Sequence, residues 1–412
     1  MQSEELPGVL LVGIRTSEIS EIEAKESLIE LERLVTTLGY KVVGTESQRL
    51  PSTKGLTVLG EGKLEELVLL RQKTSATKIF FDCDLSPFQV RNVENAVGAP
   101  VLDRTGVIIE IFSLHAKTRA ARLQVEIARQ KYLVPRLREL GAGKEHQSNQ
   151  RTGESGIEIE KRKIRDRMND LKKELEDVQA DEKNRRDRRT EQLCVALVGY
   201  TNAGKSSLMR GLTGSEVLVE DKLFATLDTT VRALQPETHP RMLVTDTVGF
   251  INKLPHDLVA SFRSTLDEAK SASLMLYVVD ASDNNFRSQL AVVREVLLEI
   301  GAENTPYFLI LNKSDCLNQE QKQGLSAEFP DSMFLSTRDP ADIQKMRESI
   351  IAFFEKDMQE EEILVPYTSQ KVIGEMRLNM KILKESYEEE GTRYLVLSRR
   401  SDLNRLKKMM SR

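Results

Sequence analysis

A glycine-rich loop near the middle of the chain constrains the fold more than any other feature. The sequence GYTNAGKS at residues 199–206 matches the pattern GxxxxGK[ST] and directly follows the apolar run Val195 to Val198. Such a loop binds an anion when a buried strand leads into it and a helix leads out of it, because N–H groups from the loop and the first helical turn must converge. We therefore predict a parallel α/β domain with a phosphate-binding loop.

The residues of this loop have distinct expected roles. The glycines let the backbone bend around phosphates, Lys205 places a positive charge on the β- and γ-phosphates, and the Ser206 hydroxyl is a ligand for Mg²⁺. The predicted nucleotide contacts in the loop are Gly199, Tyr200, Thr201, Asn202, Ala203, Gly204, Lys205 and Ser206.

A second motif follows the apolar run Met242 to Val244 and consists of Asp246, Thr247, Val248 and Gly249. Alone it would be a strand end with a capping aspartate. After a phosphate-binding loop it is typical of a switch, in which Asp246 holds Mg²⁺ through water and the Gly249 N–H points at the γ-phosphate. We count Gly249, with Lys205, among the residues expected to act in catalysis.

Two further motifs predict which base is bound. Asn312, Lys313, Ser314 and Asp315 follow the apolar run Tyr307 to Leu311. An aspartate there accepts from the guanine N1–H and exocyclic amine, which adenine does not offer, so GTP is the expected nucleotide. Ser336, Thr337 and Arg338, after Met333 to Leu335, stand where a backbone contact to the guanine O6 is expected.

The segment FATLDTT at residues 224–230 lies where a first switch should give a threonine to Mg²⁺. Thr226, Thr229 and Thr230 are all candidates, and residue chemistry does not rank them. The nucleotide contacts predicted in this segment are Phe224, Ala225, Thr226, Leu227 and Asp228.

The usual water-orienting glutamine is absent, since the position after Gly249 is Phe250. Intrinsic hydrolysis should therefore be slow or use another group. Asn202 stands directly before Ala-Gly-Lys-Ser, as in GTPases that recruit K⁺, so K⁺ dependence is a hypothesis; the alternative is an asparagine that only caps the loop. Arg232 is a further candidate cation, although a basic strand residue is the simpler interpretation.

The rest of the chain predicts three other parts around a GTPase domain at residues 192–357. Residues 1–116 alternate short apolar runs with amphipathic stretches, which favours a small parallel α/β domain. Its expected strands are 9–14, 41–43, 57–59, 78–81 and 100–102, with helices near 21–38, 61–73, 86–96 and 104–115. Residues 358–412 should form a small α+β domain, with two short strands flanking a helix between 365 and 397.

Residues 117–191 predict a helical hairpin. The first helix meets Pro135 and stops at Gly141 and Gly143. In the second helix Ile164, Met168, Leu171, Leu175 and Val178 form a coiled-coil-like seam. Its lysines and arginines gather at KRKIRDR and NRRDRR, which fits either a solvated helix face or RNA contacts.

Bulk composition excludes several classes of protein. Formal net charge is only -4, so contacts to nucleic acid must come from local clusters. Three dispersed cysteines suit a reducing compartment, and four scattered histidines indicate no metal site. An acidic N-terminus and the lack of a long apolar run favour a cytoplasmic protein without an integral membrane segment. Peripheral membrane association stays open, and a monomer is expected.

Beyond these motifs, the chain resembles the HflX family of translation-associated GTPases over nearly its whole length. The resemblance includes GEGKLEE at 60–66, LDRTGVIIEIFSLHAKTRAARLQVEIARQKYLVPRL at 102–137, GESGIE at 153–158, FATLD at 224–228 and SFRSTLDE at 261–268. It favours Thr226 as the switch threonine, a Mg²⁺ ligand and a catalytic residue. It also implies docking on the large ribosomal subunit and its RNA, hydrolysis stimulated by the ribosome, and a role in splitting or rescuing stalled ribosomes.

One departure from the family concerns the lead into GESGIE. Family members commonly carry a longer glycine-rich stretch, whereas this chain has GAGKEHQSNQRTGES. Docking is still expected, but the loop should extend a different distance toward the ribosomal RNA. Two alternatives compete: a regulatory GTPase switch that acts through a protein or membrane-associated partner, and an N-terminal domain that is an enzyme with its own ligand.

Overall fold

The computed structural model describes residues 6–142, 156–187, 192–214, 223–224, 230–247, 249–253 and 268–410. The chain forms two compact units. The N-terminal unit consists of Met1–Glu182 together with two short later segments, Asp221–Leu227 and Asn252–Arg263. The G unit consists of Lys183–Glu220, Asp228–Ile251 and Ser264–Arg412.

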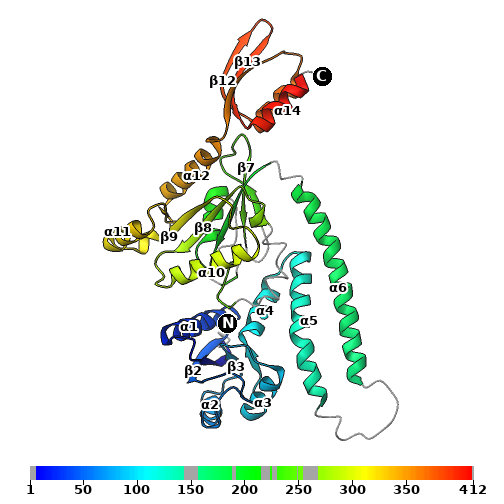
Figure 1. The fold of residues 1–412 in the computed structure, drawn as a ribbon, viewed down its shortest axis with the longest axis vertical. Coiled ribbons are helices and arrows are strands. Elements are labelled where there is room, and N and C mark those ends of the chain that lie inside the picture. The colour runs from blue at the N-terminus through cyan, green and yellow to red at the C-terminus, as the bar shows by residue number, and fades with distance from the viewer. Residues whose placement is uncertain are drawn as a thin grey trace, which may run out of the picture. The chain divides into compact units, whose positions relative to one another are not determined.

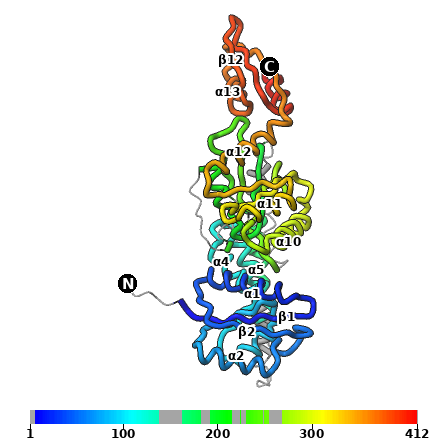
Figure 2. Tube along the Cα trace, turned by 90° about the vertical axis from the view of Figure 1, so that its left-hand side faces the viewer, coloured from blue at the N-terminus to red at the C-terminus, as the bar shows by residue number. Residues whose placement is uncertain are grey.

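The N-terminal unit is built on a parallel sheet of four strands in the order β2-β1-β3-β4. The strands are β1 (Gly8–Arg15), β2 (Lys41–Arg49), β3 (Lys78–Phe81) and β4 (Val101–Asp103). The helices are α1 (Glu21–Thr37), α2 (Glu61–Thr74), α3 (Pro87–Val97) and α4 (Arg104–His115). Helices α1 and α4 contact each other, as do α2 and α3, and Figure 2 shows the sheet between α1 and α2. Strand β1 is therefore apolar on both faces.

Local sequence determines where these helices begin. Ser20 and Glu23 form a capping box at α1, and Ser86 and Gln89 form another at α3, whose first residue is a proline. The Asp103 carboxylate accepts from the Gly106 N–H at the start of α4. Side-chain oxygens thus satisfy N–H groups that have no partner within the helix.

The strand expected at 57–59 is absent, and that prediction was wrong. Val58 has a φ of 63°, outside the strand region, yet its side chain and that of Leu59 are buried in the core. The loop carbonyls are bound by side chains of α3: Gln89 Nε2 donates to Thr53 and Gly55, at 2.7 and 2.8 Å. An apolar loop that closes a core therefore has the composition of a strand without its hydrogen bonds.

Two long helices form the predicted hairpin arms. Helix α5 (Arg119–Ala142) contains Pro135 without ending there, and α6 (Gly156–Asp187) runs beside it (Figure 1). Leu123 and Ile127 of α5 form an apolar cluster with Leu171, Leu175 and Val178 of α6. Three of the five residues predicted for the seam thus make contact with α5 in this cluster. The GES part of GESGIE lies outside the described residues.

The G unit contains a six-stranded sheet in the order β10-β9-β8-β5-β7-β6. Its strands are β5 (Leu193–Gly199), β6 (Thr230–Ala233), β7 (Met242–Asp246), β8 (Leu274–Asp280), β9 (Tyr307–Asn312) and β10 (Met333–Phe334). All are parallel except β6, which is antiparallel to β7. The helices are α7 (Lys205–Thr213), α10 (Phe286–Glu299), α11 (Gln319–Glu328) and α12 (Pro340–Glu355), with a 3₁₀ turn, η2, at Ser314–Cys316. The α/β prediction is confirmed.

The C-terminal part of this unit is an antiparallel sheet in the order β11-β13-β12, visible at the end of the chain in Figure 1. Its elements are β11 (Gln359–Val365), α13 (Gln370–Asn379), β12 (Lys381–Glu388), β13 (Gly391–Ser398) and α14 (Arg400–Met410). The expected helix between two strands is present as α13, between β11 and β12. The structure also contains a third strand, β13, and a final helix, α14. Within the described residues, no helix is long and apolar enough to cross a membrane.

Candidate functional site

The loop at 199–206 leaves the end of β5 and enters α7, whose first residue is Lys205. Gly204 has a φ of 97°, and a Cβ atom there would lie 2.1 Å from Asn312 Nδ2. Any other residue would therefore be both strained and in collision. Asn312 Nδ2 donates to the Ala203 carbonyl at 2.7 Å, so the end of β9 holds the loop in place.

Lys205 is buried within this loop. Its Nζ donates to the carbonyls of Gly199 at 3.0 Å and Tyr200 at 2.7 Å. An ammonium group has three N–H donors, so two hold the side chain in the loop and the third can reach an anion. Burial lowers the pKa of Lys205 to about 8, while Asp246 opposes that shift. A bound phosphate would favour the charged form further.

The Asp246 carboxylate lies at the end of β7, next to the phosphate-binding loop. Ser206 Oγ donates to Asp246 Oδ2 at 2.9 Å, and Asp246 is buried. Hydroxyl and carboxylate oxygens are the ligands that Mg²⁺ prefers. The Thr201 hydroxyl is also buried, and within the described residues it has no hydrogen-bond partner. These groups fit a site for a phosphate and a hard cation.

The described residues offer no group of three or more His, Cys, Asp or Glu side chains able to hold a metal. A cation at Ser206 and Asp246 would thus depend on oxygens supplied by a nucleotide and by water. That is the usual arrangement for Mg²⁺ beside substrate phosphates.

The second motif is bonded directly to the phosphate-binding loop. Thr201 N donates to the Phe250 carbonyl at 2.8 Å, and Phe250 N donates to the Gly199 carbonyl at 3.2 Å. A Cβ atom on Gly249 would lie 2.8 Å from Thr201 Cγ2, so glycine is required for this close approach. Thr247 Oγ1 donates to the Leu197 carbonyl at 2.7 Å. Gly249 is therefore placed against the residues expected to hold phosphates.

The motif at 312–315 and the loop at 336–338 form one hydrogen-bonded unit. Ser336 Oγ donates to Asp315 Oδ1 at 2.8 Å, and Thr337 N donates to Asn312 Oδ1 at 3.3 Å. The Ser336 hydroxyl, with further help from Arg338, keeps the pKa of Asp315 below its usual value. Asp315 therefore stays ionised and able to accept hydrogen bonds from a base.

Two carboxylates that sequence reasoning missed support this unit. Asp280 Oδ2 accepts from Lys313 Nζ at 2.6 Å, and Asp342 Oδ2 accepts from Ser336 N at 2.7 Å. Asp280 ends the apolar run of β8, as Asp246 ends that of β7, so its place at a strand end could have been predicted from the sequence. Asp342 lies in the first turn of α12 and carries no comparable pattern.

Several predicted contacts lie outside the described residues. These are Val248 and the segment 225–229, which includes Ala225, Thr226, Leu227, Asp228 and Thr229. Thr230 begins β6, and Arg232 is exposed on that strand. Asn202 is exposed and has a φ of 60° in the loop. The choice among the three threonines and the K⁺ hypothesis both stay predictions.

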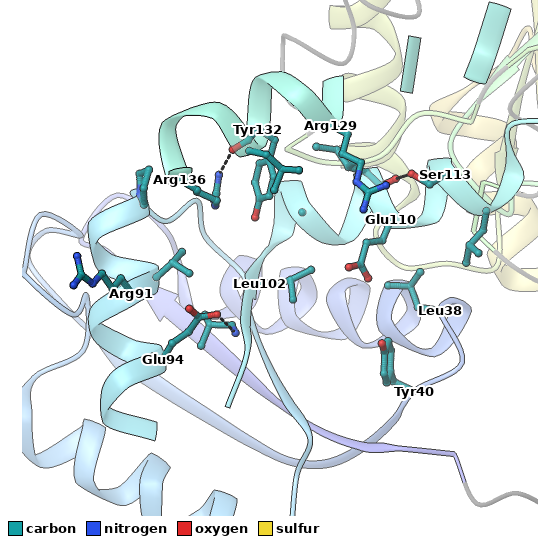
Figure 3. A pocket seen from close by; sticks show the side chains of 17 residues that line it. Leu38, Tyr40, Arg91, Glu94, Leu102, Glu110, Ser113, Arg129, Tyr132 and Arg136 are labelled. Carbon is teal, nitrogen blue, oxygen red and sulfur yellow. Dashed lines mark hydrogen bonds between the residues drawn. The ribbon is translucent and has the colours of Figure 1, made fainter. Parts of the chain in front are cut away.

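A separate cavity of about 620 Å³ lies in the N-terminal unit beside β4 (Figure 3). Its walls come from α3, α4 and α5, and its polar groups include Glu94, Glu110, Arg129, Tyr132 and Arg136. Tyr132 donates to Asp103 at 2.7 Å, and burial raises the pKa of its hydroxyl. Among the described residues, no cysteine, lysine or histidine lines the cavity.

Comparisons with known proteins agree with this geometry. Family models described as "GTP-binding GTPase N-terminal", "GTP-binding GTPase Middle Region" and "50S ribosome-binding GTPase" match residues 25–113, 115–189 and 194–313. A GTPase HflX of Gluconacetobacter diazotrophicus is 50% identical over 442 aligned residues that cover 98% of each chain. One from Caldanaerobacter subterraneus is 36% identical and covers 90% of this chain and 87% of its own.

Solved structures give a weaker likeness. A GTP-binding protein from Sulfolobus solfataricus in complex with GDP is 25% identical, with a TM-score of 0.45. The alignment covers 85% of this chain and 99% of that chain.

Proposed function

The chain belongs to the HflX family of GTPases, and from that premise we propose that it hydrolyses GTP with Mg²⁺ while docked on the large ribosomal subunit. GTP hydrolysis itself is the activity of the family. The observation that supports the proposed site most is that one side chain at the end of β9, Asn312, is hydrogen-bonded to both the phosphate loop and the loop at 336–338. Phosphate binding and base recognition therefore depend on the same residues.

The proposed roles in phosphate and Mg²⁺ binding belong to residues of the phosphate loop and the two switches. Lys205 binds the β- and γ-phosphates through its remaining N–H, and the N–H groups at the start of α7 bind the β-phosphate. Ser206, Asp246 through water, and Thr226 would hold Mg²⁺, which neutralises phosphate charge when bound. The Gly249 N–H would contact the γ-phosphate. The remaining contacts to the phosphates would come from residues 199–204 and, in the first switch, 225–228. Phe224 was also expected to contact the nucleotide, but its ring is buried against Phe112 of α4.

Base selection is proposed for Asp315 and its neighbours. Its ionised carboxylate accepts two hydrogen bonds from guanine and none of that kind from adenine. Backbone groups of Ser336, Thr337 and Arg338 would contact the guanine O6. The bonds from Ser336 to Asp315 and from Thr337 to Asn312 support this assignment, because they fix the carboxylate and the backbone relative to each other.

Slow intrinsic hydrolysis is proposed because Phe250 stands at the position where many GTPases have a water-orienting glutamine. Phe250 is 2% exposed, and its backbone is bonded to the phosphate loop, so its ring is not available to orient water. Stimulation by the ribosome would then raise the rate, as a partner that orders the switches does in other GTPases. A K⁺ ion held near Asn202 is the second proposed contribution.

Ribosome docking is proposed for the helical hairpin. Arg162, Lys163, Arg165 and Arg167 are exposed on α6, whereas Ile164 and Met168 are only partly exposed. This part of the helix presents several cations, and phosphate contacts of that kind bind RNA without reading its sequence. Splitting or rescue of stalled ribosomes is the proposed task. We propose a cytoplasmic monomer.

Co-sedimentation with purified large ribosomal subunits tests the docking proposal. A non-hydrolysable GTP analogue should retain the protein with the subunits, GDP should retain less, and binding should fall steeply across a salt series. Charge reversal at Arg165 and Arg167 should remove most binding, whereas Lys384→Glu on the C-terminal sheet should not. Binding that changes neither with salt concentration nor with these charge reversals would favour a protein partner over RNA.

A further inference from the structure

One hydroxyl group of the phosphate loop is buried without a hydrogen bond. The Thr201 side chain is 7% exposed, and within the described residues its Oγ1 has no hydrogen-bond partner. An unpaired buried hydroxyl costs free energy, because the group has lost its bonds to water and has gained none in return. A group of this kind in a folded protein calls for a structural or functional explanation.

Two other hydroxyls in the part of the chain that the structure describes are buried and unpaired in the same way. They belong to Thr245 on β7 and Ser398 on β13, and both side chains are fully covered by protein. Thr245 is paired in the sheet with Ala196 of β5 and Val231 of β6, and Ser398 ends a strand of the C-terminal part. Of the three residues, Thr201 is the one that belongs to the phosphate loop.

The N–H group of Thr201 already has a partner in the second switch. It donates to the Phe250 carbonyl at 2.8 Å, and the preceding residue, Tyr200, forms a parallel bridge with Phe250. The Thr201 N–H therefore cannot bind a phosphate without breaking this bond. In this arrangement any contact of Thr201 with a nucleotide comes from its side chain.

The Thr201 side chain lies against Gly249 of the second switch. A Cβ atom added to Gly249 would stand 2.8 Å from Thr201 Cγ2 and 3.1 Å from Lys205 Nζ. The Thr201 side chain and the Lys205 ammonium therefore lie beside the same face of Gly249. The Gly249 N–H and the Lys205 ammonium are the groups proposed to contact the γ-phosphate. Thr201 thus places a hydroxyl next to both of them.

The chemistry of a hydroxyl fits this place. A threonine hydroxyl donates one hydrogen bond, and the γ-phosphate carries anionic oxygens that accept hydrogen bonds. A hydrogen bond to an ionised acceptor is roughly twice as strong as one between neutral groups. A γ-phosphate bound beside Gly249 and Lys205 would therefore give the Thr201 hydroxyl a strong partner.

We propose that Thr201 is a specificity-determining residue, whose hydroxyl donates a hydrogen bond to the γ-phosphate of GTP. GDP ends at the β-phosphate and offers no acceptor at this place, so the hydroxyl stays unpaired in the GDP complex. GTP binding removes the cost of the unpaired hydroxyl and adds a charge-assisted hydrogen bond. The difference favours GTP over GDP. The inference rests on the proposed nucleotide site and adds to it a group that distinguishes the two nucleotides.

The test compares affinities for a non-hydrolysable fluorescent GTP analogue and for fluorescent GDP across purified full-length variants. Thr201→Val removes the hydroxyl and keeps the shape of the side chain. Thr201→Ala removes both the hydroxyl and the methyl group, and Thr201→Ser keeps the hydroxyl. Thermal unfolding without nucleotide shows which variants are folded.

Thr245→Val is the matched control, because it also removes a buried hydroxyl that has no hydrogen-bond partner. Adjacent residues of a strand point to opposite faces of the sheet, so Thr245 and Asp246 of β7 lie on different faces. The substitution therefore makes the same chemical change away from the proposed phosphate contacts.

We expect Thr201→Val and Thr201→Ala to bind the GTP analogue about tenfold more weakly and GDP within about twofold of wild type, since one hydrogen bond to a charged group is lost. Thr201→Ser should keep the wild-type affinity for the analogue within about threefold, because it keeps the donor. Thr245→Val should match wild type with both nucleotides. Without nucleotide, Thr201→Val should unfold at the wild-type temperature or above it, because an unpaired buried hydroxyl has been removed. A purely structural role would not combine unchanged or higher stability with weaker binding of GTP alone.

In the valine and alanine variants, a loss of GDP affinity as large as that of the analogue, or no loss of analogue affinity, would overturn the proposal. A loss in Thr201→Ser as large as that in Thr201→Val would also overturn it. If one of the two variants without the hydroxyl does not fold, the other still decides the matter. Failure of the site assignment would look different, because wild-type protein would then bind neither guanine nucleotide or Lys205→Ala would not lose binding.

Discussion

At the scale of single residues, the site depends on side chains that hold backbone in place. Asn312 bonds the phosphate loop on one side and the loop at 336–338 on the other. Asn312→Ala should therefore weaken GTP and GDP together, by about tenfold or more, since a buried hydrogen-bonded polar group contributes roughly 1–3 kcal/mol. Equilibrium binding of both nucleotides measures this, with Asn379→Ala, at the end of α13 in the C-terminal part, as control. A loss confined to one nucleotide would contradict it.

Asp315 allows a prediction about base choice. In Asp315→Asn an amide donor replaces one carboxylate oxygen, so the guanine amine loses an acceptor while xanthine gains a donor. We expect the variant to lose GTP affinity by at least tenfold and to bind xanthosine triphosphate better than wild type does. Retained GTP preference in competition binding would show that another residue selects the base.

The cysteines should differ sharply in reactivity. Burial, with Asp82 as the next contribution, raises the pKa of Cys83 to about 12, so almost none of it is thiolate at pH 8. Cys316 is exposed. Iodoacetamide followed by peptide mass spectrometry should label Cys316 first and Cys83 slowly. Rapid labelling of Cys83 in the folded protein would contradict the environment described for it.

At the scale of elements, helix caps give a quantitative check on the N-terminal unit. Ser86→Ala removes the capping box of α3 and should lower the free energy of unfolding by about 1 kcal/mol. Ser113→Ala, on the exposed face of α4, should change it by less than about 0.5 kcal/mol. Urea unfolding followed by circular dichroism compares the two. Equal effects would mean that the cap contributes no more than an ordinary surface contact.

Sequence patterns predicted most of the helices and strands, and the predictions that failed did so for physical reasons. Motifs at 199–206, 246–249 and 312–315 could be placed at strand ends because apolar runs precede them. The strand expected at 57–59 failed because burial and strand formation share the same residue types. Only two of the three C-terminal strands were expected, although β12 and β13 form a hairpin joined by two residues. The contacts of Phe224 with Phe112 and of Lys253 with Asp82 join residues far apart in sequence, which no local pattern encodes.

At the scale of the whole molecule, the chain combines a nucleotide site in one unit with a basic hairpin in the other. The chain passes between the units within α6, at 182–183, and again at each end of segments 221–227 and 252–263. We expect a partner that binds the hairpin to act on nucleotide turnover through these connections. This is the physical basis on which we expect a ribosomal partner to change the hydrolysis rate.

The central claim is that this protein is a GTP hydrolase whose turnover responds to the large ribosomal subunit. The most direct measurement is the rate of phosphate release from GTP with and without purified large subunits, for wild type and for a variant with Arg165 and Arg167 reversed in charge. We expect at least a tenfold stimulation of wild type and little or none of the variant, with equal basal rates. Equal stimulation of both proteins, or none of either, would contradict the account.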